Sequence, residues 1–334
     1  MASAPEGPVP VVVMGLGEIG RAVAKAALGS EEVELVAVVE NDPRMAGRKL
    51  AEVLGEPAAG TLTVTKELAA VAGKHRGAVL LHCTGSRLSQ VQDQLLVAIK
   101  AGMHVVSSCE ELAFPWLNHA EVAEKLERAA ERAEVAVLGT GVNPGFVLDR
   151  LVATLGQVTG TVRHVRAERV VDARTRREAL QRKIGAGLTE DEFDALSEKD
   201  AVGAVGLLES AALAALGLGI DCDDFEEELF PVVAQEDIEG GAFRVAKGRV
   251  AGLSQTVVGL SEGQEKVRLE LTIALGADEP GDRIRIDADV PVDLEIKGGI
   301  AGDRAAAHVM VNAAPRVAAA EPGLLTVLEL PAGR

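Results

Sequence analysis

Two adjacent glutamates are the residues of this sequence that most directly suggest chemistry. Glu110 and Glu111 follow the apolar stretch 104–107, and Phe114 and Trp116 come soon after them. A carboxylate held beside aromatic side chains can accept and return protons as a general acid/base. The alternative is that both acids lie in the first turn of a helix, where the helix dipole favours them. The residues alone leave both roles open.

A glycine motif, GLGEIG, lies near the start of the chain between an apolar run and a helical pattern. In a dinucleotide fold such glycines allow a tight turn, the approach of a pyrophosphate to the backbone, and close packing of a helix on a strand. The helix N-terminus adds N–H groups and the positive end of a dipole. We therefore expect a dinucleotide to bind at Gly15, Gly17, Glu18, Ile19 and Gly20.

An acid follows the second apolar run, 33–39. This acid, Glu40, comes about twenty residues after the glycines, where an acid binds the ribose hydroxyls of NAD. A carboxylate repels a 2′-phosphate, so we predict NAD as the cofactor. Arg44 is close enough to soften this preference, and NADP is the alternative. Glu40 could instead be a solvated charge at a strand end.

The other apolar runs also end in segments with candidate binding residues. Thr84, Gly85 and Ser86 are expected to pass under the adenosine side of the cofactor, and Cys109 is grouped with the cofactor-binding residues. Asn143, in a glycine-rich segment, is suited to hold a carboxamide such as that of nicotinamide. Four further residues would line a mainly apolar substrate pocket: Phe114, Trp116, Val142 and Phe146.

Alternating strands and helices must position these segments. The apolar patterns predict strands over 11–14, 33–39, 79–83, 104–107 and 135–138, and helices over 43–54, 87–101 and 117–133. Such alternation is typical of a doubly wound parallel sheet. Ligands of these sheets bind at the carboxyl ends of the strands, where all the segments named above lie.

The pattern changes after residue 149 to one with longer strands. Strands are predicted over 161–171, 232–238, 243–251, 265–275 and 282–296, and helices over 174–184, 189–198 and 203–217. Thr189 and Glu192 have the spacing of a capping box. Strands with helices on one face form an open-faced α+β layer. A second copy of the chain is the simplest cover for the other face, so we predict a homodimer through this sheet.

The chain therefore divides into two predicted domains. Residues 1–148 form a dinucleotide-binding domain, to which 303–334 are expected to return, and 149–302 form a substrate and dimerisation domain. A basic cluster in the second domain is interpreted as a solvated helix face, with a substrate carboxylate or a dimer contact as the alternative. Its members are Arg174, Arg176, Arg177, Arg182 and Lys183.

Composition excludes several other classes of protein. The net charge of −17 argues against nucleic acid or an anionic membrane as a partner. No apolar run reaches the length of a membrane span, and residues 1–8 lack the pattern of a signal peptide. The three cysteines have no metal-ligand spacing, so we predict reduced thiols in a cytoplasmic protein without a metal. The absence of tyrosine excludes acid/base chemistry by a phenol.

Six motifs together give the chain a family resemblance. They are GLGEIG, CEELAFPW, TGVNPGFVLD, KIGAGLTEDEF, VGLLES and HVMVNAAPRV. With them the sequence resembles 2,4-diaminopentanoate dehydrogenase and the related native amine dehydrogenases, and more distantly dihydrodipicolinate reductase and homoserine dehydrogenase. The resemblance implies a Rossmann domain, a second α+β domain that dimerises, and oxidation of CH–NH2 groups with NAD or NADP.

The resemblance also implies roles for single residues. Homoserine dehydrogenase-like enzymes have a catalytic lysine at about the position of Glu110, which favours Glu110 as the acid/base residue, with Glu111 in reserve. Relatives often read GHVGL where this chain has Ala204 in place of the histidine. This departure weakens a substrate role for that position and suggests a different substrate.

The resulting hypothesis is an amine dehydrogenase. It would deaminate a small amine oxidatively, or aminate a ketone or aldehyde with ammonia in reverse. One alternative is oxidation of 2,4-diaminopentanoate or another diamino acid, which needs a polar partner for the second amine or the carboxylate. Another is a sensor that binds a dinucleotide without turnover.

Overall fold

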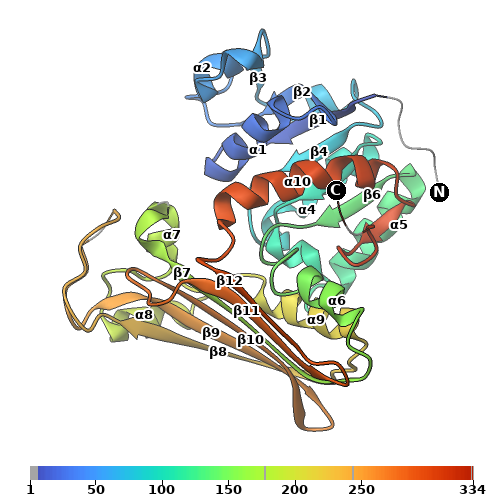
Figure 1. Ribbon diagram of the computed structural model, residues 1–334. Coiled ribbons are helices and arrows are strands. Elements are labelled where there is room, and N and C mark those ends of the chain that lie inside the picture. The colour runs from blue at the N-terminus through green and yellow to red at the C-terminus, as the bar shows by residue number, and fades with distance from the viewer. Residues whose placement is uncertain (1–6, 177, 243, 332, 334) are drawn as a thin grey trace. The chain divides into compact units, whose positions relative to one another are not determined.

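The apolar stretches of the first half of the chain are strands of one sheet in the computed structural model, which describes residues 7–176, 178–242, 244–331 and 333 (Figure 1). Backbone contacts divide the chain into two compact units. One comprises Met1–Phe146 and Ala301–Arg334, and the other comprises Val147–Ile300.

The sheet of the first unit is parallel throughout, in the order β13-β6-β5-β4-β1-β2-β3. Its strands are β1 (Val9–Met14), β2 (Val33–Val39), β3 (Val64–Thr65), β4 (Val79–His82), β5 (His104–Ser107), β6 (Ala136–Gly139) and β13 (Gly323–Leu325). The central strands read as nearly continuous apolar runs because helices bury both faces of a parallel sheet.

Helices cover this sheet in two groups. α1 (Glu18–Leu28) packs on α10 (Gly302–Ala318), which also contacts β1, β4, β5 and β6. α4 (Leu88–Lys100) packs on α5 (Ala120–Ala133), and both contribute to a core that includes Leu80 and Val105. The shorter helices are α2 (Leu50–Leu54), α3 (Ala69–Ala72) and the 3-10 turns η1 (Pro57–Ala59) and η2 (Glu110–Ala113). The doubly wound parallel fold predicted from the sequence is confirmed.

One predicted helix of this unit is mostly absent. The pattern over 43–54 indicated a helix, but only Leu50–Leu54 is helical, and turns precede it. The carboxylate of Asp42 accepts hydrogen bonds from the backbone N–H and the side chain of Arg44. This local bonding competes with helix formation at the point where the helix was expected to begin.

The second unit contains a mixed sheet in the order β12-β11-β7-β10-β9-β8. Its strands are β7 (Val162–Asp172), β8 (Asp224–Val233), β9 (Val250–Ser261), β10 (Gln264–Ala274), β11 (Gly281–Ala288) and β12 (Val292–Lys297). β7 and β10 pair in parallel, and the other neighbours are antiparallel.

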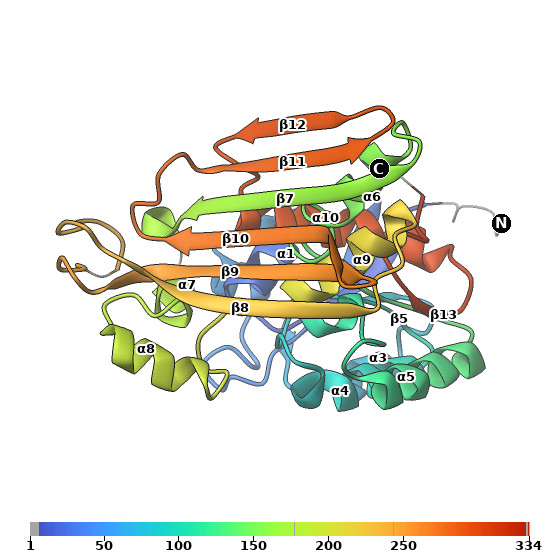
Figure 2. The ribbon, with the colours of Figure 1, turned by 90° about the horizontal axis from the view of Figure 1, so that it is seen from below.

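Helices cover one face of this second sheet. α9 (Leu207–Leu218) packs on β9, β10 and α6 (Arg150–Gly156). The other helices of this unit are η3 (Ala173–Thr175), α7 (Glu178–Lys183) and α8 (Glu190–Ser197), and the capping box of Thr189 and Glu192 is present at α8. Figure 2 looks onto the opposite face, where, within the described chain, no helix of this unit lies over the strands. This arrangement confirms the open-faced α+β layer.

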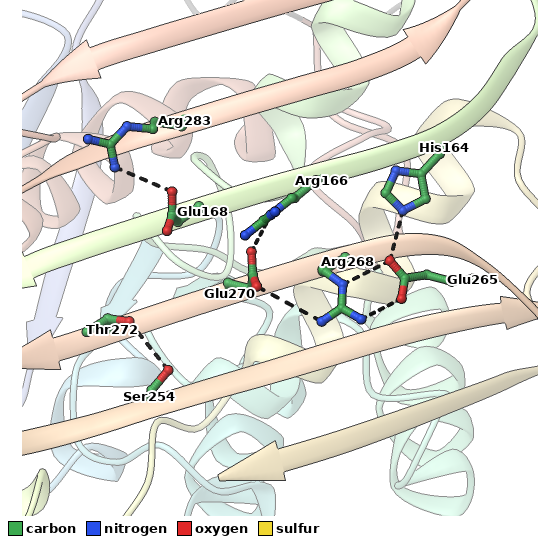
Figure 3. A network of polar contacts seen from close by, with 9 residues as sticks. All are labelled: His164, Arg166, Glu168, Ser254, Glu265, Arg268, Glu270, Thr272 and Arg283. Atoms are coloured by element: carbon green, nitrogen blue, oxygen red, sulfur yellow. Dashed lines mark hydrogen bonds and ion pairs between the residues drawn. The ribbon is translucent and has the colours of Figure 1, made fainter. Parts of the chain in front are cut away.

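The opposite face is polar and carries ion pairs between neighbouring strands (Figure 3). Arg166 on β7 pairs with Glu270 on β10 at 2.5 Å. Glu265 on β10 pairs with His164 on β7 at 3.0 Å and, within its own strand, with Arg268 at 2.5 Å. The charges of this face are therefore largely balanced within the sheet.

Three predicted strands of this unit were wrong in their bounds. The strands expected over 232–238 and 243–251 correspond to β8 and β9, and residue 243 lies outside the described residues. β8 was misplaced because its sequence, DFEEELFPVV, contains four acidic residues and none of its ten residues is buried. The single strand expected over 282–296 is a pair, β11 and β12, separated by residues 289–291.

Candidate active site

Four neighbouring strands bring the candidate residues to one edge of the first unit's sheet. β6, β5, β4 and β1 lie side by side and run in the same direction. The segments after them are therefore neighbours: the glycine loop after β1, 84–87 after β4, 108–116 after β5, and 140–146 after β6. This edge is where a doubly wound fold binds its ligand.

The glycine loop has the geometry that the motif predicts. Gly15 has φ of +90°, and a Cβ there would lie 2.5 Å from the carbonyl oxygen of Cys83. A Cβ on Gly20 would overlap the carbonyl group of Gly15, so α1 can pack this closely only with glycine. Gly17 precedes Glu18, the first residue of α1, and the space beside its Cα is open. A phosphate could approach the helix N-terminus through that space.

Glu40 is held against this loop. One carboxylate oxygen accepts a hydrogen bond from the N–H of Leu16 at 2.6 Å, and the other from the N–H of Asp42 at 2.9 Å. Its carboxylate therefore lies beside the glycine turn, which is the position expected of a ribose-binding acid.

Arg44 is bonded to an acid of its own loop. Its guanidinium group donates to both carboxylate oxygens of Asp42, with Nη2 to Oδ2 at 2.6 Å. These bonds lower the pKa of Asp42 from 3.8 to about 2, so the acid stays ionised near neutral pH. The positive charge of Arg44 is thus balanced within the loop.

The loop after β4 is anchored by a buried histidine. His82 Nδ1 lies 2.8 Å from Ser107 Oγ, and its Nε2 lies 2.9 Å from Gln94 Oε1 and 2.7 Å from Thr84 Oγ1. Burial lowers the pKa of His82 to about 4, and the ring is neutral near pH 7. The network joins the carboxyl ends of β4 and β5 to α4.

Glu111 is buried and fully engaged with protein groups. One oxygen accepts from the N–H of Leu88 at 2.6 Å and lies 3.1 Å from Nε2 of His119. The other lies 3.4 Å from the guanidinium group of Arg87. The backbone N–H of Glu111 donates to the carbonyl oxygen of Ser86. Glu111 therefore bonds to the start of α4 and to the segment before α5.

Glu110 opens the same turn and is half-buried. The turn η2 can lie close to the end of β6 because that strand ends in glycine. A Cβ on Gly139 would lie 2.5 Å from the backbone nitrogen of Ala113. Glu111 has the bonds of a residue that caps a helix start. Glu110, which the family resemblance favours, therefore stays the candidate for acid/base chemistry.

Asn143 has a buried amide oxygen that needs a partner. Within the described part of the chain, Asn143 Oδ1 has no hydrogen-bond donor. A buried polar atom of this kind costs free energy unless a ligand or water satisfies it. The carboxamide N–H group of a nicotinamide is a donor of the right kind, so this residue fits the cofactor predicted from the sequence.

The predicted apolar pocket residues are partly brought together. Phe114 and Trp116 pack edge to face, with ring centroids 5.4 Å apart, and the Trp116 residue remains 37% exposed. Val142 is buried and Phe146 is half-buried in the segment after β6. The Cys109 thiol lies in the core, and burial and then the nearby Glu110 charge raise its pKa. Because the Cys109 residue is 1% exposed, its thiol is not available for the predicted cofactor contact.

The basic cluster of the second unit is partly engaged in local ion pairs. Arg174 bonds to Asp172, and Arg182 bonds to Glu178 one turn earlier. Arg177 lies outside the described residues.

Several residues at the sheet edge were not predicted from the sequence. The sheet edge is also shaped by Arg87, His119, Asp42 and Gly139. The groups that these residues contact are distant in the sequence or are placed by local turns. Only Gly139, which ends an apolar run, carries a signal of close backbone approach. Among the described residues, no three potential ligands from His, Cys, Asp and Glu gather as a metal site, and no helix is long and apolar enough to cross a bilayer.

Comparisons with known proteins place the chain in a family. Residues 146–334 match the 2,4-diaminopentanoate dehydrogenase C-terminal domain, and residues 9–138 match the N-terminus of dihydrodipicolinate reductase. The chain belongs to the 2,4-diaminopentanoate dehydrogenase family. The family resemblance inferred from the sequence motifs is confirmed. The chain is an oxidoreductase with the Rossmann-like fold of dehydrogenases that use a nicotinamide dinucleotide.

Individual relatives of this family align along nearly the whole chain. A 2,4-diaminopentanoate dehydrogenase from Acetoanaerobium sticklandii is 27% identical over 98% of this chain and 94% of that protein. An amine dehydrogenase from Streptomyces virginiae is 23% identical over 97% of this chain and 96% of its own length. The structure of an amine dehydrogenase from Mycobacterium smegmatis superposes with a TM-score of 0.87 at 21% identity, covering 99% of this chain and 98% of that one.

Proposed function

We propose that the chain is an NAD(P)-dependent amine dehydrogenase. It converts a small amine and water into a ketone or aldehyde and ammonia, and it aminates the carbonyl compound in reverse. The proposal rests above all on the edge of the parallel sheet, which bears the glycine loop, the unpaired amide oxygen of Asn143 and the turn with Glu110. The names of the relatives support a CH–NH2 donor.

The cofactor would be held by Gly15, Gly17, Gly20, Glu40 and Asn143. Bound NAD(P) supplies the hydride acceptor for oxidation and the hydride donor for reduction. NAD is favoured because Glu40 and Asp42 present two carboxylates near the ribose position, and Arg44 is already bonded to Asp42. A 2′-phosphate would meet net negative charge there.

Glu110 would act on the substrate at two points. Loss of hydride from the amine carbon leaves a cationic iminium, which a nearby carboxylate stabilises. The carboxylate takes a proton from the water that adds to the iminium carbon, and the proton is returned to the amino group, which leaves as ammonia. Acid/base help of this kind contributes roughly 10²–10⁴-fold to the rate.

A simple alkyl amine fits the site better than a diamino acid. Phe114, Trp116, Val142 and Phe146 offer apolar contacts. The 27% identical relative is nevertheless named for a diamino acid, which makes 2,4-diaminopentanoate-like compounds the second candidate substrates.

Oxidation assays would test the proposal. The protein is given NAD+ or NADP+ with a panel of alkyl amines and one diamino acid, while reduced cofactor and ammonia are both measured. We expect equal amounts of the two products, with NAD+ and an alkyl amine preferred. Preference for the diamino acid would favour the second candidate, and cofactor binding without any turnover would favour a non-catalytic sensor.

A further inference from the structure

The buried carboxylate of Glu111 links three segments that are separate in the sequence. It accepts the N–H of Leu88 at the start of α4, and it lies within ion-pair distance of Arg87 and His119. Since Glu111 belongs to η2, its side chain fastens this turn to the loop after β4 and to the residue preceding α5. The backbone hydrogen bond from Glu111 to Ser86 reinforces the link to the loop after β4.

Two of these segments carry the proposed function. The loop after β4 contains Thr84, Gly85 and Ser86, which are candidates for contact with the cofactor. The turn η2 begins with Glu110, the proposed acid/base residue. A group that sets the distance between the two segments also sets the position of the carboxylate relative to the cofactor.

The environment of Glu111 can stabilise a buried negative charge. The residue is 6% exposed, and a carboxylate so deeply buried is stable only when it is paired and hydrogen-bonded. Arg87 offers a cation and the helix start offers an N–H group beside the positive end of the dipole. A neutral amide could still accept from Leu88 but could not pair with the guanidinium group.

We propose that Glu111 is a positioning residue, whose carboxylate holds the cofactor-contacting loop after β4 and the Glu110 turn in one arrangement. The proposal rests on the proposed function for the role of Glu110. Glu111 itself exchanges no proton with the substrate. Its loss would alter both cofactor affinity and the rate of the chemical step, because both segments lose their common anchor.

Glu110→Gln and Glu111→Gln would separate the two roles in the full-length protein. For Glu110→Gln we expect kcat to fall by about 10²-fold or more, with unchanged NADH affinity and loss of the acidic limb of the kcat–pH profile. For Glu111→Gln we expect weaker NADH binding and a kcat lowered by about tenfold to a hundredfold, with that acidic limb retained. Glu121→Gln, which changes an exposed acid in α5, is the matched control and should resemble wild type.

Chemical rescue gives a second measurement. Formate should restore part of the activity of Glu110→Ala, because a diffusible acid can replace a proton carrier. It should not restore Glu111→Ala, because formate cannot join η2 to its neighbours.

Two results would overturn the proposal. In one, Glu111→Gln loses the acidic limb and Glu111→Ala is rescued by formate, which makes Glu111 the acid/base residue. In the other, Glu111→Gln equals wild type in kcat, NADH affinity and melting temperature. The NADH affinity and melting temperature need no turnover, so they test the positioning role even if no amine is oxidised and the proposed function fails.

Discussion

At the scale of single residues, the proposed preference for NAD depends on how Asp42 engages Arg44. The bonds from Arg44 hold the pKa of Asp42 at about 2, so this ion pair persists at every pH where the enzyme would work. An arginine at this loop could otherwise bind a 2′-phosphate.

Asp42→Asn should therefore improve the use of NADP+. Without the Asp42 charge, Arg44 is released, and we expect the ratio of kcat/KM for NADP+ to that for NAD+ to rise by about tenfold, the effect of one hydrogen bond to a charged group. Steady-state kinetics with both cofactors would measure this ratio. The double variant Asp42→Asn/Arg44→Ala should lose the gain. If it keeps the gain, Arg44 has no part in the selection.

The protonation of His82 makes the free energy of unfolding depend on pH. Its pKa falls from 6.5 to about 4 in the fold, so the unfolded chain binds a proton that the native protein does not over that range. The contribution of neutral His82 to the free energy of unfolding is therefore fully present above about pH 6.5, and it is lost as the pH falls towards 4.

Between pH 7 and pH 5 this loss amounts to about 2 kcal/mol in the free energy of unfolding. His82→Asn should remove that part of the pH dependence, although the variant is less stable at both values. Urea unfolding at the two pH values would measure it. His308→Asn, which changes an exposed histidine of α10, is the control. An unchanged slope in His82→Asn would contradict the assignment.

At the scale of elements, a glycine at the end of β6 sets the place of the Glu110 turn. A Cβ at residue 139 would collide with backbone atoms of η2, which cannot move aside as a flexible side chain could. The turn must shift if any larger residue is present.

Gly139→Ala should cost about 1–3 kcal/mol of stability through overpacking and should lower kcat more than it weakens NADH binding. Thermal unfolding, kinetics and NADH titration would show this together. Gly73→Ala is the control, because Gly73 has φ of −65° and open space beside it. Wild-type kcat in Gly139→Ala would show that η2 tolerates the shift and that Glu110 needs no exact placement.

The elements around the site were predictable to different degrees. Five strands of the parallel sheet and the glycine turn were predictable, because buried apolar runs and Gly15 each have a local cause, whereas the short edge strands β3 and β13 were not predicted. The different roles of Glu110 and Glu111 could not be predicted. They depend on Leu88 and His119, which approach Glu111 only in the folded unit. The bounds of β8 were wrong because its acidic residues hide the strand pattern, and these residues are tolerated since β8 lies at the edge of a sheet with a polar face.

At the scale of the whole molecule, the polar face of the second sheet is the predicted dimer surface. Many of its charges are paired within the chain (Figure 3), while Glu226 and Glu228 on the edge strand β8 lie on the same face. Phe230 lies opposite Ser254 on this face and is 56% exposed. Exposed aromatic side chains are enriched in protein–protein contact surfaces, which makes Phe230 the residue of this face to test.

Phe230→Glu should weaken this predicted homodimer, because it would place a charge in the contact. Light scattering over a range of concentrations should give twice the chain mass for wild type and a shift towards monomer for the variant. Val290→Glu, which changes an exposed residue between β11 and β12, is the control. A wild-type protein that remains monomeric would remove the prediction.

The measurement that tests the central claim most directly is NADH oxidation with small ketones and aldehydes, in the presence and absence of a high concentration of ammonium. The proposed amine dehydrogenase should oxidise NADH only when ammonium is present, and should form the corresponding amine. Equal oxidation without ammonium would show a carbonyl reductase and would contradict the account.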